Sequence, residues 1–111
     1  MKKIYVAHPL RGSGAREEDF NRRMVRLICQ EIAEAYPDIL IFSPIQALSF
    51  LPAYGDQTTA FRHCRGWLEV CDELWVFGNW ELSEGCTMEV AVAQLLGKPV
   101  IFKDARRRAG G

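Results

Sequence analysis

Ser83 and Glu89, six residues apart, are the pair in this sequence with the clearest chemical potential. Ser83 precedes a stretch with helical spacing, so its hydroxyl can cap the helix by accepting a hydrogen bond from a free backbone N–H. The same N–H groups and the helix dipole attract anions, and the serine can equally help to bind a phosphate. The sequence leaves both roles open.

Glu89 lies about two turns into the same predicted helix. The apolar stripe of this helix is formed by Met88, Val92, Leu95 and Leu96. At about 3.6 residues per turn, Glu89 falls on the shoulder of that stripe and is partly shielded from water. A carboxylate in such a place either pairs with an arginine on the flank of the helix or acts on a ligand.

A second candidate segment is the predicted loop at residues 8–15, which contains Arg11, Gly12 and Gly14. Glycines allow backbone N–H groups to turn toward an anion, and Arg11 adds a permanent positive charge. A phosphate would suit this loop. A plain turn with a solvated arginine explains the same residues.

Four short apolar runs predict the strands that must position these loops: residues 3–7, 39–42, 73–77 and 99–102. The run at 39–42 has no polar alternation, which is typical of a parallel strand buried on both faces. Helical spacing predicts helices at about 16–36, 59–71 and 85–96. The first of them has an apolar face with Phe20, Met24, Leu27, Ile28, Ile32 and Ala35.

Residues 45–58 show no clean period, so we expect a loop with one short helical turn that can wall a pocket. Phe50 and Tyr54 in this segment, and Trp80 in the predicted loop at 78–84, are aromatic. They can stack on the base of a nucleotide or pack against the core.

The alternation of strands and helices predicts an α/β fold with a doubly wound parallel sheet, flavodoxin-like or Rossmann-like. The expected strand order is 2-1-3-4, with helices on both faces. Such sheets bind ligands at the carboxyl ends of the strands, where the winding reverses. That point lies between the first and third strands, so the loops at 8–15 and 78–84 should meet there.

The length of 111 residues is sufficient for one domain, which we place at 1–104, followed by a basic, flexible tail at 105–111. Fourteen basic and fourteen acidic residues give a formal net charge of zero. No overall field therefore attracts nucleic acid, and a small anion is the better expectation for a ligand.

Targeting signals and cysteine spacing indicate where the protein is located and in which state its cysteines are. No apolar run is long enough to cross a bilayer and the chain starts without a signal sequence, so we expect a cytoplasmic protein that does not contact membranes. The four cysteines form no Cys-x-x-Cys pair. They are predicted to be buried free thiols, and neither a metal site nor a cofactor is expected.

Three segments carry a family resemblance: Tyr5-Val-Ala-His-Pro-Leu-Arg11-Gly12, Ser83-x-Gly85-x-x-x-Glu89 and Gly97-Lys98-Pro99-Val100. Together they resemble the nucleoside 2-deoxyribosyltransferase-like proteins. The similarity is greatest to the 2'-deoxynucleoside 5'-phosphate N-hydrolase branch and to small bacterial and phage relatives. It spans about residues 3–102.

This resemblance implies an N-glycosidase that cleaves or transfers the base of a nucleoside 5'-monophosphate. Glu89 would attack the anomeric carbon of the sugar, and Tyr5 would orient the glutamate. The residues implied in binding the phosphate and the rest of the substrate are His8, Arg11, Gly12, Ser83 and Gly85. The resemblance also implies a homodimer or a higher homo-oligomer, in which a neighbouring subunit completes the pocket.

The chain departs from the family where a proton donor is expected. The family has an aspartate three residues before a Trp-Leu pair, and here that position is Cys64. Asp56, His63 and His8 are possible replacements, although an aspartate often forms a turn and a histidine often lies on a helix surface. A catalytically silent nucleotide-binding module is therefore the alternative hypothesis, and a role in assembly through a partner is a third.

Overall fold

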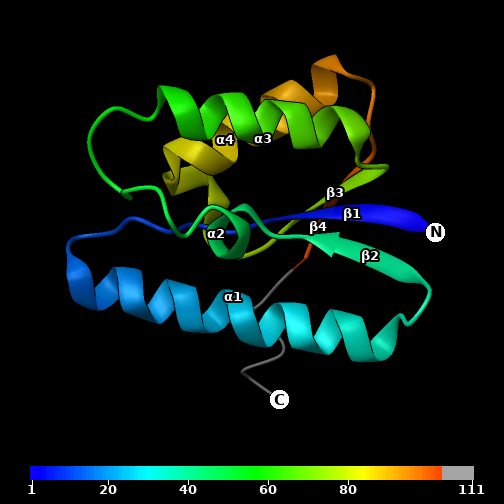
Figure 1. Cartoon of the computed structure of the whole chain (residues 1–111), viewed down its shortest axis with the longest axis horizontal. Coiled ribbons are helices and arrows are strands. Elements are labelled where there is room, and N and C mark those ends of the chain that lie inside the picture. Colours follow the sequence, from blue (N-terminus) through cyan, green and yellow to red (C-terminus); the bar gives the residue numbers. More distant parts are fainter. Residues whose placement is uncertain (104–111) are drawn as a thin grey trace.

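A parallel sheet forms the centre of the computed structural model, which describes residues 1–103 (Figure 1). Its strands are β1 (Lys2–Ala7), β2 (Ile39–Phe42), β3 (Glu73–Val76) and β4 (Val100–Phe102). They are arranged in the order β2-β1-β3-β4, and all neighbouring pairs are parallel. The predicted fold class and strand order are confirmed, while the predicted tail at 105–111 lies outside the described residues.

The helices follow the predicted pattern closely. They are α1 (Ala15–Ala35), α2 (Pro44–Ala47), α3 (Thr58–Val70) and α4 (Glu84–Leu95), with a short 3-10 helix η1 (Trp80–Leu82). The three long helices begin and end one residue earlier than predicted. The helical turn expected near 45–58 is α2, whereas η1 was not predicted.

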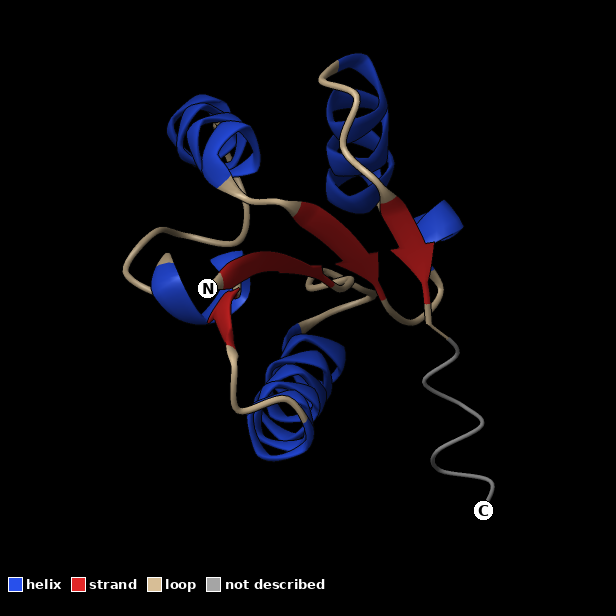
Figure 2. Ribbon diagram, turned by 90° about the vertical axis from the view of Figure 1, so that its right-hand side faces the viewer, coloured by secondary structure: helices blue, strands red, loops and turns tan. Residues whose placement is uncertain are grey.

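Alternating side chains of the central strands build a core on each face of the sheet. Ile4 and Val6 of β1 pack with residues of α1, and Tyr5 and Ala7 pack with residues of α3 and α4. Figure 2 shows this arrangement end-on, with helices on both faces of the sheet. Tyr5 therefore points to the face that also carries α4.

β2 corrects one prediction, because this strand is not buried on both faces. Leu40 keeps 51% of its surface exposed. β2 is an edge strand in the observed order, with a neighbouring strand on one side only. An uninterrupted apolar run predicts the strand but does not distinguish an edge position from a central one.

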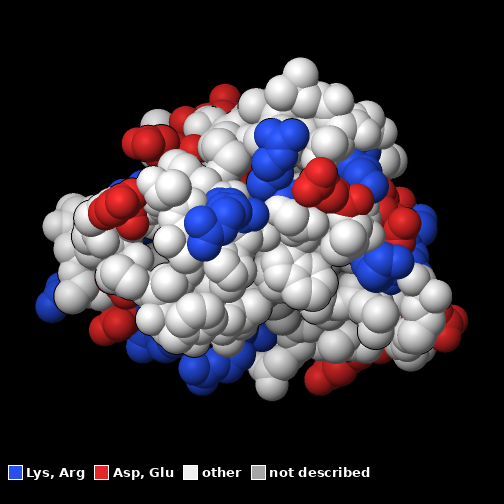
Figure 3. Space-filling model, turned by 45° about the horizontal axis from the view of Figure 1, so that its top comes forward, with Lys and Arg blue, Asp and Glu red and all other residues white. Residues whose placement is uncertain are grey.

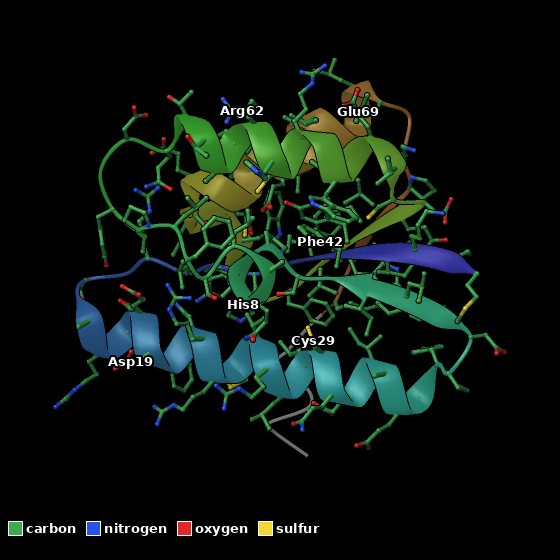
Figure 4. All side chains as sticks on the ribbon, in the orientation of Figure 1. His8, Asp19, Cys29, Phe42, Arg62 and Glu69 are labelled. Atoms are coloured by element: carbon green, nitrogen blue, oxygen red, sulfur yellow. The ribbon has the colours of Figure 1, made fainter. Side chains whose placement is uncertain are left out.

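The apolar face of α1 is also rotated from the predicted one. Phe20 and Leu27 are each 52% exposed, while Val25, Ile28 and Ile32 are buried. Burial of Val25 turns the packed face away from Leu27, because residues two apart on a helix do not share a face. Cys29 lies on the side of α1 that faces the sheet (Figure 4).

Three of the four cysteines, Cys64, Cys71 and Cys86, are buried and Cys29 is partly buried; all are free thiols. The prediction of free thiols is therefore confirmed. None of the helices within residues 1–103 has the length and apolar character to span a membrane.

Candidate active site

The loops after β1 and β3 meet at the carboxyl edge of the sheet, as predicted from the strand order. Phe77 N–H donates to the carbonyl of Ala7 at 2.9 Å, which continues the pairing of the two strands to their ends. Gly78 follows with a φ of 71°, and a Cβ atom there would lie 3.2 Å from Pro9 Cδ. A larger residue at 78 would strain the backbone and press on the first loop.

A pocket of about 560 Å³ opens at this edge. Among its lining residues are six of those expected at the site: His8, Arg11, Gly12, Ser83, Gly85 and Glu89. Figure 4 shows His8 near the centre of the molecule, where the loop leaves β1. Segments far apart in the sequence thus supply one cavity.

Glu89 lies on the buried side of α4 and not on its shoulder. Its residue is only 6% exposed, and Cys86, Val90 and Ala93 are buried with it. Leu95, which the predicted stripe included, is 85% exposed. Val92 and Leu96 of the predicted stripe are partly buried and pack against the same core. The buried side of α4 is therefore rotated from the predicted stripe toward Glu89, and Leu95 is left exposed.

Tyr5 holds Glu89 from the central strand. Its hydroxyl donates a hydrogen bond to Glu89 Oε2, and the tyrosine is fully buried. The ring of Phe42 lies 5.3 Å from the ring of Tyr5 and fixes its position from β2. Burial, followed by the charge of Glu89, raises the pKa of Tyr5 well above its ordinary value, so the phenol keeps its proton and remains a donor.

Burial also raises the pKa of Glu89, from 4.5 to about 7. Hydrogen bonds from Tyr5 and Cys64 act in the opposite direction and favour the ionised carboxylate. Near neutral pH the two protonation states of Glu89 coexist. A carboxylate tuned in this way inside a pocket is typical of a functional group and not of a surface ion pair.

Glu89→Gln is expected to be more stable than the wild type at pH 8 and equally stable near pH 4. Folding raises the pKa of Glu89 to about 7, so ionisation as pH rises lowers the free energy of unfolding. The full loss, reached above pH 7, is about 3 kcal/mol. The neutral amide of the variant does not ionise, so the variant avoids this loss of stability. Denaturant unfolding of both proteins between pH 4 and pH 8 measures the difference.

The groups that face Glu89 do not obscure this comparison. Burial raises the pKa of Cys64 to about 11 and that of Cys86 to about 12, and Tyr5 titrates higher than its ordinary value. All three therefore stay neutral over the range. The same pH dependence of stability in both proteins would contradict the assigned protonation of Glu89.

The amino end of α4 contributes Ser83, Glu84 and Gly85 to the lining of the pocket. Ser83 Oγ accepts a hydrogen bond from the backbone N–H of Cys86 at 3.2 Å, which leaves its hydroxyl proton for a ligand. Capping and ligand binding are therefore compatible roles for this serine. Glu84, an exposed carboxylate, also lines the pocket and would oppose an anion placed beside it.

Arg11 brings a positive charge to the same pocket. It takes part in none of the ion pairs seen within residues 1–103, which join Lys2 to Glu73, Lys3 to Asp72 and Arg22 to Glu18. Arg22 also lines the pocket, but Glu18 holds its guanidinium at 3.0 Å. Of the two arginines, Arg11 is the one available to a ligand.

His8 is partly buried beside this loop. Its Nδ1 lies 2.7 Å from the carbonyl oxygen of Pro9. Because a carbonyl only accepts, Nδ1 carries the proton and Nε2 is unprotonated in the neutral ring. Burial lowers the pKa of His8, against the effect of the hydrogen bond to Pro9, so the neutral ring predominates at pH 7.

The structure does not bring Asp56 or His63 into the pocket. Asp56 accepts hydrogen bonds from Thr58 N and Thr58 Oγ1 at 3.0 and 2.7 Å, at the start of α3. His63 Nδ1 lies 2.9 Å from the carbonyl oxygen of Thr59. Cys64 does line the pocket, and its pKa of about 11 keeps the thiol protonated.

Much of the remaining lining is apolar. We call five of these residues the apolar wall: Leu48, Leu51, Tyr54, Phe61 and Met88. Of the aromatic residues singled out in the sequence, only Tyr54 lines the pocket, because Phe50 faces solvent and Trp80 stacks on Phe102.

The sequence predicts only one part of this wall, the segment at residues 45–58. The spacing of Phe61 and Cys64, three residues apart on one helix face, is the signal that could have identified the contribution of α3.

Charge and metal-binding potential are modest over the described surface. Figure 3 shows basic and acidic side chains intermixed over the face that carries α3 and α4, separated by uncharged areas. Within residues 1–103, no group of three or more His, Cys, Asp or Glu side chains is placed to hold a metal ion. The candidate site residues, among them Arg11, Ser83 and Glu89, lie in the pocket.

Comparisons with known proteins identify a family and a shared fold. The family described as "Domain of unknown function (DUF4406)" matches residues 2–102. No curated protein matches the chain in sequence.

Three solved structures are similar in fold. A 2-deoxyribosyltransferase from Bacillus psychrosaccharolyticus aligns with a TM-score of 0.63 at 20% identity, over 92% of this chain and 72% of that one. A conserved protein from Enterococcus faecalis V583 aligns with a TM-score of 0.73 at 22% identity, over 92% and 62%. The CMP N-glycosidase BcmB from Clostridium botulinum aligns with a TM-score of 0.62 at 14% identity, over 93% and 71%.

These alignments confirm the resemblance at the level of the fold. The chain spans about two thirds of the length of each of these structures. At such identities, similarity of fold does not by itself transfer an activity.

Proposed function

The chain belongs to the DUF4406 family, and we propose that it is an N-glycosidase that releases the base from a nucleoside 5'-monophosphate. Glu89 is the proposed nucleophile. The observation that carries this proposal is the carboxylate of Glu89, buried in the pocket and held by the hydroxyl of Tyr5.

The reaction needs a carboxylate close to the sugar. Breaking the bond between C1' and the base nitrogen passes through an oxocarbenium-like transition state, which a nearby negative charge stabilises. A carboxylate oxygen of Glu89 would bond to C1' as the base leaves with the bonding electron pair. Water would then attack C1', release the sugar phosphate and return the carboxylate.

Tyr5 acts in this scheme as a positioning residue. Its hydrogen bond fixes the rotamer of Glu89 and favours the ionised state that nucleophilic attack requires. Because Tyr5 is fully buried beneath the pocket, it orients the carboxylate without occupying space needed by a substrate.

The 5'-phosphate fits the opposite side of the pocket. Arg11 supplies a positive charge, Ser83 a hydroxyl proton, and the first turn of α4 its free N–H groups. A neutral serine at this place does not repel a phosphate, as a carboxylate would. The apolar wall that includes Leu48 and Phe61 is left for the base.

The solved structures support this choice of chemistry. Two of the similar proteins are described as a 2-deoxyribosyltransferase and a CMP N-glycosidase, which both act at the bond between a base and a sugar. The pocket is also large enough for a nucleotide, because its volume of about 560 Å³ lies within the range of small-molecule sites.

A nucleotide-binding module without turnover is the second candidate. The observation that favours it is Cys64, a thiol with a pKa of about 11, which lines the pocket in place of an acid. Such a module would keep the phosphate site and the apolar wall but would release no base.

Incubation with a panel of nucleoside 5'-monophosphates separates the two candidates. Free base measured by chromatography is expected for at least one member, together with a rise in melting temperature on binding. A thermal shift with no release from any member would favour the binding module. The matching free nucleosides serve as controls for the contribution of the phosphate.

A further inference from the structure

Within residues 1–103, the side chains that line the pocket give a leaving base a poor source of a proton. We propose that the preferred substrates are nucleoside 5'-monophosphates whose base is bonded to C1' through a cationic ring nitrogen, such as a pyridinium or an N7-alkylated purine. This inference rests on the proposed function and narrows its substrate class.

Cys64 is the ionisable residue of α3 that lines the pocket with Glu89. The thiol is buried, and burial together with the charge of Glu89 raises its pKa to about 11. A thiol so weakly acidic transfers a proton poorly to a leaving nitrogen near pH 7. The thiol acts instead on Glu89, because it lowers the pKa of that carboxyl.

His8 is no better placed as an acid. Its Nδ1 proton is engaged with the carbonyl of Pro9, and its Nε2 would lie 3.4 Å from a Cβ atom built on Gly78. The unprotonated nitrogen therefore sits against the loop at 78 and carries no proton to give while the ring is neutral.

The other ionisable groups that residues 1–103 bring to the lining are Cys86, whose pKa burial raises to about 12, and groups that lie at the phosphate end or are permanently charged. Glu84 is exposed on the first turn of α4, and Arg11 and Arg22 do not act as acids at neutral pH. Tyr54 is the remaining candidate, at an exposed position in the loop before α3. Tyr54→Phe therefore belongs among the test variants.

A cationic base removes the need for an acid. When the bond from C1' to a positively charged nitrogen breaks, the electron pair goes to that nitrogen and the base departs neutral. Glu89 forms the new bond to C1', and no proton is transferred in this step. The later attack by water releases one proton to solvent.

The lining of the pocket also suits a positive charge. The carboxylate of Glu89 attracts a cation, and the rings of Phe61 and Tyr54 lie in the wall where a planar base would stack. Arg11 remains matched to the phosphate at the other end. A zwitterionic substrate would therefore complement both ends of the site.

The test compares 7-methylguanosine 5'-monophosphate with guanosine 5'-monophosphate, which differ by one methyl group and its charge. Nicotinamide mononucleotide is the pyridinium probe. With spontaneous loss subtracted, kcat/KM for the methylated nucleotide is expected to exceed that for the unmethylated one by about 100-fold or more, the usual contribution of a general acid. Tyr54→Phe should leave this ratio unchanged.

Placing an acid at position 64 should reduce the preference for the methylated nucleotide over the unmethylated one. In Cys64→Asp the new carboxyl would lie beside Glu89, where like charges keep one of the two protonated. Release of guanine is then expected to rise by about tenfold or more, with little change for the methylated base. Cys64→Asn, of the same size but without an acid, is the matched control and should show no gain.

Equal release of the two guanine bases by the wild type would overturn this inference and leave the proposed function standing. A large loss of guanine release in Tyr54→Phe would also overturn it, by identifying Tyr54 as the acid. No release from any probe, despite a thermal shift, would overturn the proposed function itself and this inference with it. The comparison of substrates on the wild type stands even where a variant fails to fold.

Discussion

Glu89→Gln is expected to lower base release by about three orders of magnitude or more, because an amide cannot form the bond to C1'. The side chain keeps its size, and its amide oxygen can still accept the hydrogen bond from Tyr5. Binding of a nucleoside 5'-monophosphate should therefore persist. Single-turnover release of base and a thermal shift on the same protein measure the two quantities separately.

Glu69→Gln is the matched control for this variant. Glu69 is an exposed glutamate near the end of α3 and does not line the pocket (Figure 4). Its substitution should leave turnover within about twofold of the wild type, as is usual for a surface change. If Glu89→Gln kept near-normal turnover, Glu89 would be a structural residue and the glycosidase proposal would lose its main support.

Arg11→Ala is expected to weaken binding of a nucleoside 5'-monophosphate by about 10- to 100-fold, the usual range for a hydrogen bond to a charged group. Binding of the matching free nucleoside should change by less than about threefold, because it lacks the phosphate. Isothermal titration with both ligands measures the difference. The guanidinium has no ion-pair partner within residues 1–103, so its removal leaves no carboxylate there uncompensated.

Arg62→Ala controls for the general loss of one positive charge. Arg62 is exposed on α3 and does not line the pocket (Figure 4). Its effect on both ligands should be small and should fade with added salt. An equal loss of affinity for nucleotide and nucleoside in Arg11→Ala would show that Arg11 does not bind the phosphate.

Local spacing was sufficient to predict most of the elements. The predicted bounds of the three long helices differ from the observed ones by one residue. The strand order was predicted from short apolar strands separated by helices. That order also predicted the meeting of the loops after β1 and β3. The reason is that the rule on ligand sites depends on topology, which the element sequence determines.

Burial was less predictable because it depends on neighbours far away in the chain. Leu40 is exposed at an edge that no local pattern reveals, and Leu95 faces solvent although it is strongly apolar. Glu89 is buried on a side of α4 made of small residues. On that helix the predicted apolar stripe was rotated from the buried side, although Val92 and Leu96 do pack against the core. The family resemblance was the better guide to Glu89.

The proton donor shows the same limit. Asp56 and His63 have suitable chemistry and lie near Cys64 in the sequence, but their side chains bond to their own segment at the start of α3. Whether a side chain of α3 enters the pocket depends on the helix face on which its residue lies. Phe61 and Cys64 share the inward face, while His63 is absent from the pocket lining.

Trapping the sugar on Glu89 is the measurement that tests the account most directly. A nucleoside 5'-monophosphate with fluorine at C2' would form the glycosyl ester but release it slowly, because fluorine destabilises the oxocarbenium-like transition state. Mass spectrometry of the intact protein and its peptides is predicted to show one added fluorinated sugar phosphate, on the peptide that contains Glu89. Base release with an unmodified Glu89, or an adduct on another residue, would contradict the account.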